Sequence, residues 1–198
     1  MLPSLAKFFI IAALVSQLDG ACDLSLQILK DLTFQLSGSS LDWPCQSTKN
    51  IYVQSSRYIP KSVIMTRAQI HRDEAFVTLP RLKQGVPFTL GKVSLRRGQC
   101  VTKVAPWPCW SLQEEGNCQA LQSAVDIFLD PNEILWVLDV GVVNTLEQPV
   151  RRCPPKVVGI NVKTGRLVKS IDLSSLVAPN SRLQHLVVEY DETGHCFM

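Results

Sequence analysis

The chain has 198 residues, of which 46% are hydrophobic and 19% charged, and its formal net charge is +3. Its 20 basic residues nearly balance its 17 acidic residues, so charge says little about partners. The basic residues are dispersed, with Arg96-Arg97 and Arg151-Arg152 as their adjacent pairs, so we expect no nucleic-acid partner.

The N-terminal residues have the pattern of an export signal. Lys7 is followed by the apolar run 8–15, which has the length of a signal-peptide core. The small residues Gly20 and Ala21 follow where cleavage is expected. We therefore predict a signal peptide at residues 1–21.

A membrane anchor is the alternative for the same segment. The apolar run is far shorter than the ~20 residues that a membrane-spanning helix needs. We therefore expect the mature chain, residues 22–198, to be secreted into the extracellular space with no membrane attachment after cleavage.

Cysteine content agrees with export. Cysteines in an exported chain mostly form disulfides, and an odd number leaves at least one without a partner in the chain. The sequence has no Cys-x-x-Cys or His-x-x-x-His spacing and its three histidines are scattered, so we expect no metal site. The seven cysteines are Cys22, Cys45, Cys100, Cys109, Cys118, Cys153 and Cys196.

The N-terminal half predicts two helices followed by strands. Leucines at near-helical spacing predict a helix over Ser25–Gln35, and a weaker helical pattern covers Thr48–Ser56. Strand-forming residues predict strands at Ala75–Leu79 and Pro87–Val93. Two prolines in Ala105–Trp110 each lack an N–H donor, so this segment is expected to be an irregular, aromatic surface loop.

The C-terminal half predicts antiparallel hairpins. Asp130-Pro131-Asn132-Glu133 suits a type I turn, and Lys163-Thr164-Gly165 offers a glycine for a left-handed turn position. The strands expected beside these turns are Val125–Leu129, Ile134–Val140, Lys156–Val162 and Arg166–Ile171. A further strand is expected at Gln184–Tyr190, with a return strand beginning at Cys196.

Successive short hairpins predict an all-β fold. Periodicity alone leaves a sandwich, a barrel and a propeller open. The last hairpin would leave an open sheet edge, which folded proteins normally cover or pair. We therefore expect the chain to be the N-terminal portion of a larger fold.

Several motifs carry a family resemblance. They resemble, in order and spacing, those of the insect yellow and major royal jelly protein family, and within it the yellow-g branch associated with eggshell. The matching segments are Trp43-Pro44, Tyr58-Ile59-Pro60-Lys61, Phe76-Val77-Thr78-Leu79-Pro80-Arg81, Gly85-Val86-Pro87-Phe88-Thr89-Leu90, Pro106-Trp107-Pro108-Cys109-Trp110, Gly116-Asn117-Cys118, Leu135-Trp136-Val137-Leu138-Asp139-Val140-Gly141 and Cys153-Pro154-Pro155-Lys156.

The resemblance implies a six-bladed β-propeller of antiparallel four-stranded blades, each of roughly 40–50 residues. Residues 22–198 would then form about half of the propeller, and we expect little activity from them alone because the ligand channel would be incomplete.

The resemblance also implies a set of functions among which the fold does not choose. The first is a secreted extracellular-matrix protein of eggshell or cuticle, or a pigmentation factor. The alternatives are a dopachrome-converting isomerase and a biogenic-amine-binding protein. Expected partners are a small aromatic amine or catechol-derived ligand and extracellular matrix proteins, with no cofactor.

Disulfide pairing cannot be copied from the family, because Asp130-Pro131-Asn132 replaces its Asp-x-Cys. We favour Cys118 with Cys153, since both flank the hairpin at 125–140. Closing that loop of about 35 residues would contribute about 3–4 kcal/mol. Cys100 with Cys109 is the second choice.

Ligand-binding candidates come from aromatic and acidic residues. Trp107 and Trp110 could stack on an aromatic ligand, or they could pack a proline-rich loop. Asp139, with Asp126 and Asp130, could supply a general base. The alternative is structural, with Asp130 starting a turn and Asp139 bonding the neighbouring backbone at a strand end.

The histidines give weaker signals. His71 could transfer protons, although its position beside Arg72 and Asp73 favours an exposed residue at a strand edge. His185 and His195 have no partner pattern in the sequence. No catalytic residue of the family can be assigned from these motifs.

Overall fold

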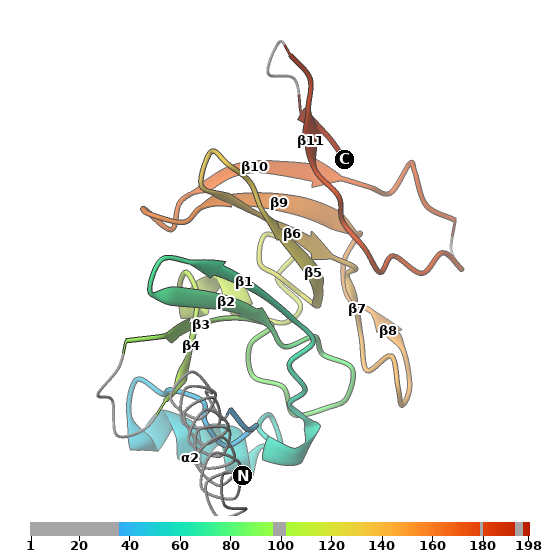
Figure 1. The fold of residues 1–198 in the computed structure, drawn as a ribbon. Helices are drawn as coiled ribbons and strands as arrows, with labels where there is room; N and C mark the ends of the chain where they lie inside the picture. The colour runs from blue at the N-terminus through green and yellow to red at the C-terminus, as the bar shows by residue number, and fades with distance from the viewer. Residues whose placement is uncertain (1–35, 97–101, 179, 193–195) are drawn as a thin grey trace, which may run out of the picture. The chain divides into compact units, whose positions relative to one another are not determined.

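The computed structural model describes residues 36–96, 102–178, 180–192 and 196–198 (Figure 1). All of them belong to one unit, Leu36–Met198. The predictions that lie outside the described residues are the signal peptide at 1–21, the helix at Ser25–Gln35, Cys22, Cys100 and His195.

The first sheet has four antiparallel strands in chain order, β1-β2-β3-β4 (Figure 1). Ala75, Phe76 and Val77 of its inner strand β2 are all buried, because consecutive side chains point to opposite faces and both faces are covered. The strands are β1 Arg67–His71, β2 Glu74–Thr78, β3 Leu90–Ser94 and β4 Val104–Pro106.

The second sheet has the order β10-β9-β6-β5 and is also antiparallel. Gly165 adopts a positive φ of 68° in the turn between β9 and β10, as its place in the sequence predicts. The strands are β5 Ala124–Leu129, β6 Ile134–Asp139, β9 Lys156–Asn161 and β10 Leu167–Asp172.

Short elements connect and extend the sheets. β7 pairs with β8 and β11 pairs with β12 as two-stranded sheets. None of the helices in the described part of the chain is long and apolar enough to cross a membrane. The short helices are α2 Gln46–Gln54, η1 Pro60–Ser62 and η2 Trp110–Gln113. The short strands are β7 Val142–Val143, β8 Val150–Arg151, β11 Glu189–Tyr190 and β12 Cys196–Phe197.

One hydrophobic core joins the two sheets. Phe76 and Leu90 from the first sheet share a buried cluster with Ile127 and Leu135 from the second. Residues alternate between faces along a strand, so Trp136 of β6 lies in a separate cluster on the opposite face of the second sheet.

A buried guanidinium lies where the two sheets meet. Arg81 is 3% exposed, and its N–H groups donate to five backbone carbonyls. The accepting oxygens belong to Val86, Pro87, Gln113, Leu121 and Gln122, at 2.5–3.2 Å.

Burial lowers the pKa of Arg81 to about 10, so the group stays charged at neutral pH. Its nearest carboxylate, that of Glu115, lies 3.9 Å away, which is too far for a direct hydrogen bond. The charge is therefore solvated mainly by carbonyl oxygens.

The all-β prediction is confirmed, and the hairpins at 125–140 and 156–171 form where the sequence indicates. The helix predicted at Thr48–Ser56 is present as α2, Gln46–Gln54. The strand predicted at Pro87–Val93 begins later, at Leu90.

Two expectations were wrong. Ala105–Trp110 is not wholly irregular, because Val104–Pro106 forms β4; this strand lies at a sheet edge, where proline is tolerated. The strand predicted at Gln184–Tyr190 is restricted to Glu189–Tyr190, since the N–H of Leu186 donates to the carboxylate of Asp126 instead of to a strand.

Replacing Arg81 by Met should lower the free energy of unfolding by about 3 kcal/mol or more, because each carbonyl left buried without a donor costs about 1–3 kcal/mol and five carbonyls lose theirs. Urea-induced unfolding measures the loss. Arg151→Met, at an exposed position of β8, is the matched control and should change stability by less than about 0.5 kcal/mol. Equal stability of the two variants would contradict the role given to Arg81.

Candidate ligand site

Alternate residues of β1 join the two sheets through their side chains. β1 and β5 are edge strands of separate sheets and share no backbone ladder. Residues 67, 69 and 71 point to one face of β1, and each contacts β5 or the turn after it. The contacts are Arg67 Nε to Asp126 Oδ1 at 3.3 Å, Gln69 Nε2 to the carbonyl of Ile127 at 3.4 Å, and His71 Nε2 to Glu133 Oε1 at 3.1 Å.

Three charged or titratable side chains meet at one end of this row. Arg67 Nη2 lies 3.2 Å from His185 Nδ1, and the same imidazole nitrogen lies 3.7 Å from Asp126 Oδ2. The side chains of Arg67 and His185 are 46% and 68% exposed, whereas that of Asp126 is 10% exposed. A buried carboxylate thus supports two exposed groups.

Asp126 is held rigidly beneath them. Its carboxylate accepts hydrogen bonds from the N–H groups of Ile127 at 3.0 Å and Leu186 at 2.9 Å. These bonds fix the oxygens that contact Arg67 and His185. The arrangement can bind an oxygen of a ligand through the guanidinium and exchange a proton through the imidazole.

The sequence indicates only one member of this cluster. Asp126 is a general-base candidate there, whereas no pattern distinguishes Arg67 and none gives His185 a partner. The guanidinium and the imidazole are 118 residues apart in the chain, so no local pattern indicates their contact.

A second charged cluster surrounds Glu133, in the turn between β5 and β6. Its carboxylate forms ion pairs with Lys163, Arg72 and His71. The hydrogen bond from Lys163, followed by that from His71, holds the pKa of Glu133 below its ordinary value. The expectation of an exposed His71 was wrong, because this pairing leaves its side chain 17% exposed.

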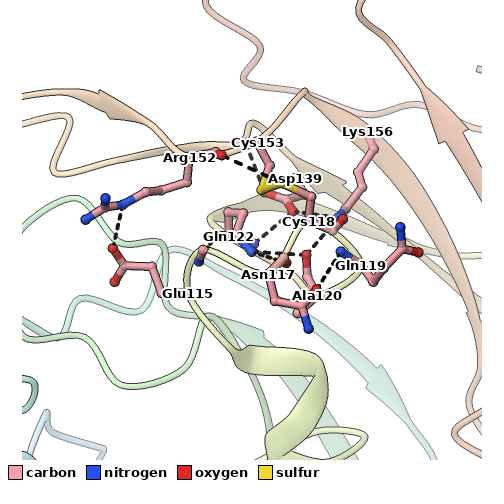
Figure 2. The surroundings of a disulfide bond; sticks show 12 residues. Glu115, Asn117, Cys118, Gln119, Ala120, Gln122, Asp139, Arg152, Cys153 and Lys156 are labelled. Atoms are coloured by element: carbon pink, nitrogen blue, oxygen red, sulfur yellow. Dashed lines mark hydrogen bonds and ion pairs between the residues drawn. A yellow bond between two sulfur atoms is a disulfide. The ribbon is translucent and has the colours of Figure 1, made fainter.

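Asp139 lies at the end of β6 and is fully buried. Its carboxylate accepts from the N–H groups of Gln122 and Ser123, each at 2.8 Å, and from that of Gly141 at 3.0 Å. Its place beside Gln122 and Lys156 is visible in Figure 2. The backbone bonding suggested for Asp139 is thus observed, and the structure gives the residue a structural role.

Asp130 also bonds its own turn, since its carboxylate accepts from the N–H of Ile134 at 2.9 Å and from the indole N–H of Trp136 at 2.8 Å. The hydroxyl of Tyr190 donates to the same carboxylate. Burial, followed by this hydrogen bond, raises the pKa of Tyr190.

The disulfide predicted between Cys118 and Cys153 is confirmed (Figure 2). Beside it, Lys156 Nζ donates to the carbonyls of Cys118 at 2.6 Å and Ala120 at 2.7 Å, and burial lowers its pKa. The structure records Cys109 as a free thiol. Its suggested partner Cys100 lies outside the described residues, so that pairing stays a prediction.

The two tryptophans of the proline-rich segment both pack against other rings. Trp107 is buried, with its ring centroid 4.6 Å from that of Phe76. Trp110 is half-buried and lies 5.4 Å from Trp43 and 5.5 Å from Phe88. The expected exposed loop was therefore wrong for Trp107, and the packing alternative describes both side chains.

A pocket of about 230 Å³ lies beside the disulfide and shares no lining residue with the Arg67 cluster. The pocket is lined by Leu112, Cys118, Gln119, Leu121, Pro154, Lys156, Val158, Leu167, Ser170 and Asp172.

Within the described ranges, no three His, Cys, Asp or Glu side chains are grouped as metal ligands would be.

Comparison with known proteins identifies the relatives of the chain. The family model for major royal jelly proteins matches residues 122–198. Major royal jelly protein 3 of Apis mellifera is 37% identical over 110 residues, which are 56% of this chain and 20% of the relative. Dopaminechrome tautomerase of Drosophila melanogaster is 30% identical over 139 residues, 68% of this chain and 30% of that protein. The chain belongs to the yellow and major royal jelly protein family.

Protein yellow of Drosophila melanogaster is 27% identical to this family member over 158 residues, 77% of the chain and 29% of the relative. The chain thus spans about a fifth to a third of the length of these relatives. The segments 76–81 and 85–90, which carry part of the sequence resemblance, contain Arg81 and two of the carbonyls that it binds. In this chain the two segments are therefore joined by the Arg81 side chain.

Replacing Glu133 by Gln should lower the melting temperature at pH 7, because three cationic or imidazole partners lose their carboxylate. The lowered pKa means that this stabilisation is present above the ordinary pKa of glutamate and is lost as pH falls through the folded value. Melting temperatures measured from pH 7 to pH 3 should therefore converge. Glu192→Gln, at an exposed glutamate outside this cluster, is the control, and a difference independent of pH would contradict the prediction.

Replacing Cys118 and Cys153 together by Ser should lower the free energy of unfolding by about 3–4 kcal/mol, since the unfolded chain gains entropy. Denaturant unfolding without reductant measures the change. Gln119→Ser in the same exposed loop should cost less than about 0.5 kcal/mol. A double variant as stable as that control would show that the bond does not stabilise the fold.

Proposed function

We propose that the protein is an exported member of the yellow family that isomerises a catechol-derived aminochrome, such as dopachrome, to a dihydroxyindole. The reaction would serve pigmentation or the formation of eggshell or cuticle, in line with the resemblance to the yellow-g branch. The observation that carries the proposal is the cluster of Arg67, Asp126 and His185.

This isomerisation moves protons from two ring carbons to two quinone oxygens and needs no oxidant. It requires a group that takes a proton from carbon and a donor that stabilises charge on oxygen. The guanidinium of Arg67 is suited to the second task. His185 is suited to the first, because its Nδ1 lone pair becomes available when Arg67 donates to the ligand oxygen instead of to the imidazole. Asp126 positions both groups from below and stabilises an imidazolium when it forms.

The similarity to dopaminechrome tautomerase of Drosophila melanogaster supports this reaction class, since that name describes an aminochrome isomerisation. We further propose that the two four-stranded sheets are successive blades of a six-bladed β-propeller. Each sheet begins with an edge strand, β1 or β5, and these strands contact each other through side chains. In a propeller such first strands line the central channel, where a ligand would reach Arg67.

Amine binding and a matrix role without turnover are the alternatives. An amine binder needs a carboxylate available to an ammonium group. Asp126 already pairs with Arg67 and bonds two backbone N–H groups, which favours binding of an oxygen-rich ligand over an amine.

The test is the rate at which dopachrome loses its colour with the full-length protein, expressed from its complete transcript with its export signal. The protein should accelerate the loss over a boiled control. His185→Gln should lower kcat/KM by about 100-fold or more, the usual contribution of a general acid or base. His71→Gln is the matched control, because His71 lies in the separate Glu133 cluster.

No acceleration by the wild-type protein would exclude the isomerase. Heat released on titration with serotonin or dopamine would then support the amine binder. Recovery only from the insoluble matrix of follicle or epidermal cells, without heat or turnover, would support the structural role.

A further inference from the structure

Two free cysteines begin two helices of the described structure. Cys45 precedes α2 and Cys109 precedes η2, and both residues have extended backbone conformations. Both thiols are exposed. The fold and the proposed reaction leave these two thiols without a role.

An aromatic cluster brings the two helix starts toward each other. Trp43, two residues before Cys45, has its ring centroid 5.4 Å from that of Trp110, which directly follows Cys109. Tyr52 of α2 adds contacts of 5.3 Å to Trp43 and 5.9 Å to Trp110. The segments that carry the two thiols are therefore packed together by three rings.

Helix α2 has few other attachments to the protein. None of its residues is buried, and no side chain caps its first turn. The indole N–H of Trp43 is buried without a hydrogen-bond partner, which weakens the contact that holds the segment. A covalent link at this point would secure a helix that packing alone holds weakly.

We propose that Cys45 and Cys109 form a disulfide in the exported protein. A Sγ–Sγ bond forms, both thiol protons are released, and the two electrons reduce a disulfide of a thiol–disulfide exchange catalyst in the export pathway to its dithiol. The bond closes the segment 45–109, which contains all four strands of the first sheet. The disulfide Cys118–Cys153 encloses the first hairpin of the second sheet in the same way.

The surroundings of Cys45 favour this exchange. Its Sγ lies 3.0 Å from the hydroxyl of Ser47 and 3.2 Å from that of Thr48, at the N-terminus of a nine-residue helix. The hydrogen bond from Ser47, followed by that from Thr48, lowers the pKa of the thiol to about 7. A thiol with a pKa near ambient pH is an effective attacking group in disulfide exchange.

The pairing competes with the one suggested by the sequence. Cys109 can bond either Cys45 or Cys100, and the packing of Trp43 on Trp110 favours Cys45. The two possibilities can be separated chemically, because Lys103 divides the peptides that contain Cys100 and Cys109.

The test is peptide mapping of the 198-residue chain secreted from insect cells, with free thiols alkylated at acid pH and no reductant. Trypsin cleaves after Lys49 and Lys103, and a protease specific for glutamate cleaves after Glu114, between Cys109 and Cys118. Mass spectrometry should find the peptide of Cys45 joined to that of Cys109, and reduction should separate them.

Single variants provide a second measurement. Cys45→Ser should leave the thiol of Cys109 open to alkylation, and Cys109→Ser should do the same for Cys45. Cys100→Ser is the control and should keep the linked peptides. Joined peptides of Cys100 and Cys109, alkylation of both Cys45 and Cys109 in the wild-type chain, or a bond from either to a second molecule would overturn the proposal.

Discussion

The fold depends on the convergence of backbone carbonyls on one buried guanidinium. Arg81 lies three residues after the end of β2, yet it binds carbonyls both from the loop that leads to β3 and from the segment that leads to β5. A buried cation without a close carboxylate is costly unless every N–H is satisfied. The loops of both sheets are therefore constrained together around Arg81.

The contact between the sheets has two chemically different layers. The first layer is an apolar core shared by Phe76 and Ile127, which provides most of the driving force for packing the sheets together through its buried area. The second layer consists of the contacts that Arg67 and His71, at opposite ends of β1, make with acidic side chains of the second sheet. Surface ion pairs add little stability, so the residues of this polar layer can change without loss of the fold.

The sequence predicts the parts of the fold that local chemistry determines. The turns at Asp130 and Gly165 have characteristic residues, and the hairpins form around them. The bond between Cys118 and Cys153 was also predictable, because both flank one hairpin. These features involve residues that are close in the chain or enclose a single unit.

Interactions over long separations were not predictable from one sequence. The pairing of Arg67 with His185 depends on how β1, β5 and the segment before β11 are arranged in space. Trp107 is buried although prolines surround it, because its ring fills space beside Phe76. The strand expected at Gln184–Tyr190 is shortened by another long-range contact. The N–H of Leu186 donates to the Asp126 carboxylate of β5 and is not available for a strand ladder.

The hydrogen bond from Leu186 to Asp126 couples the attachment of the segment before β11 to the assembly of the cluster of Arg67, Asp126 and His185. The segment before β11 is attached to β5 at the same carboxylate that orients Arg67 and His185. Detachment of this segment would remove His185 and free one oxygen of Asp126 in a single motion. The rate of hydrogen exchange at the Leu186 amide would therefore measure how often this segment detaches and the cluster comes apart.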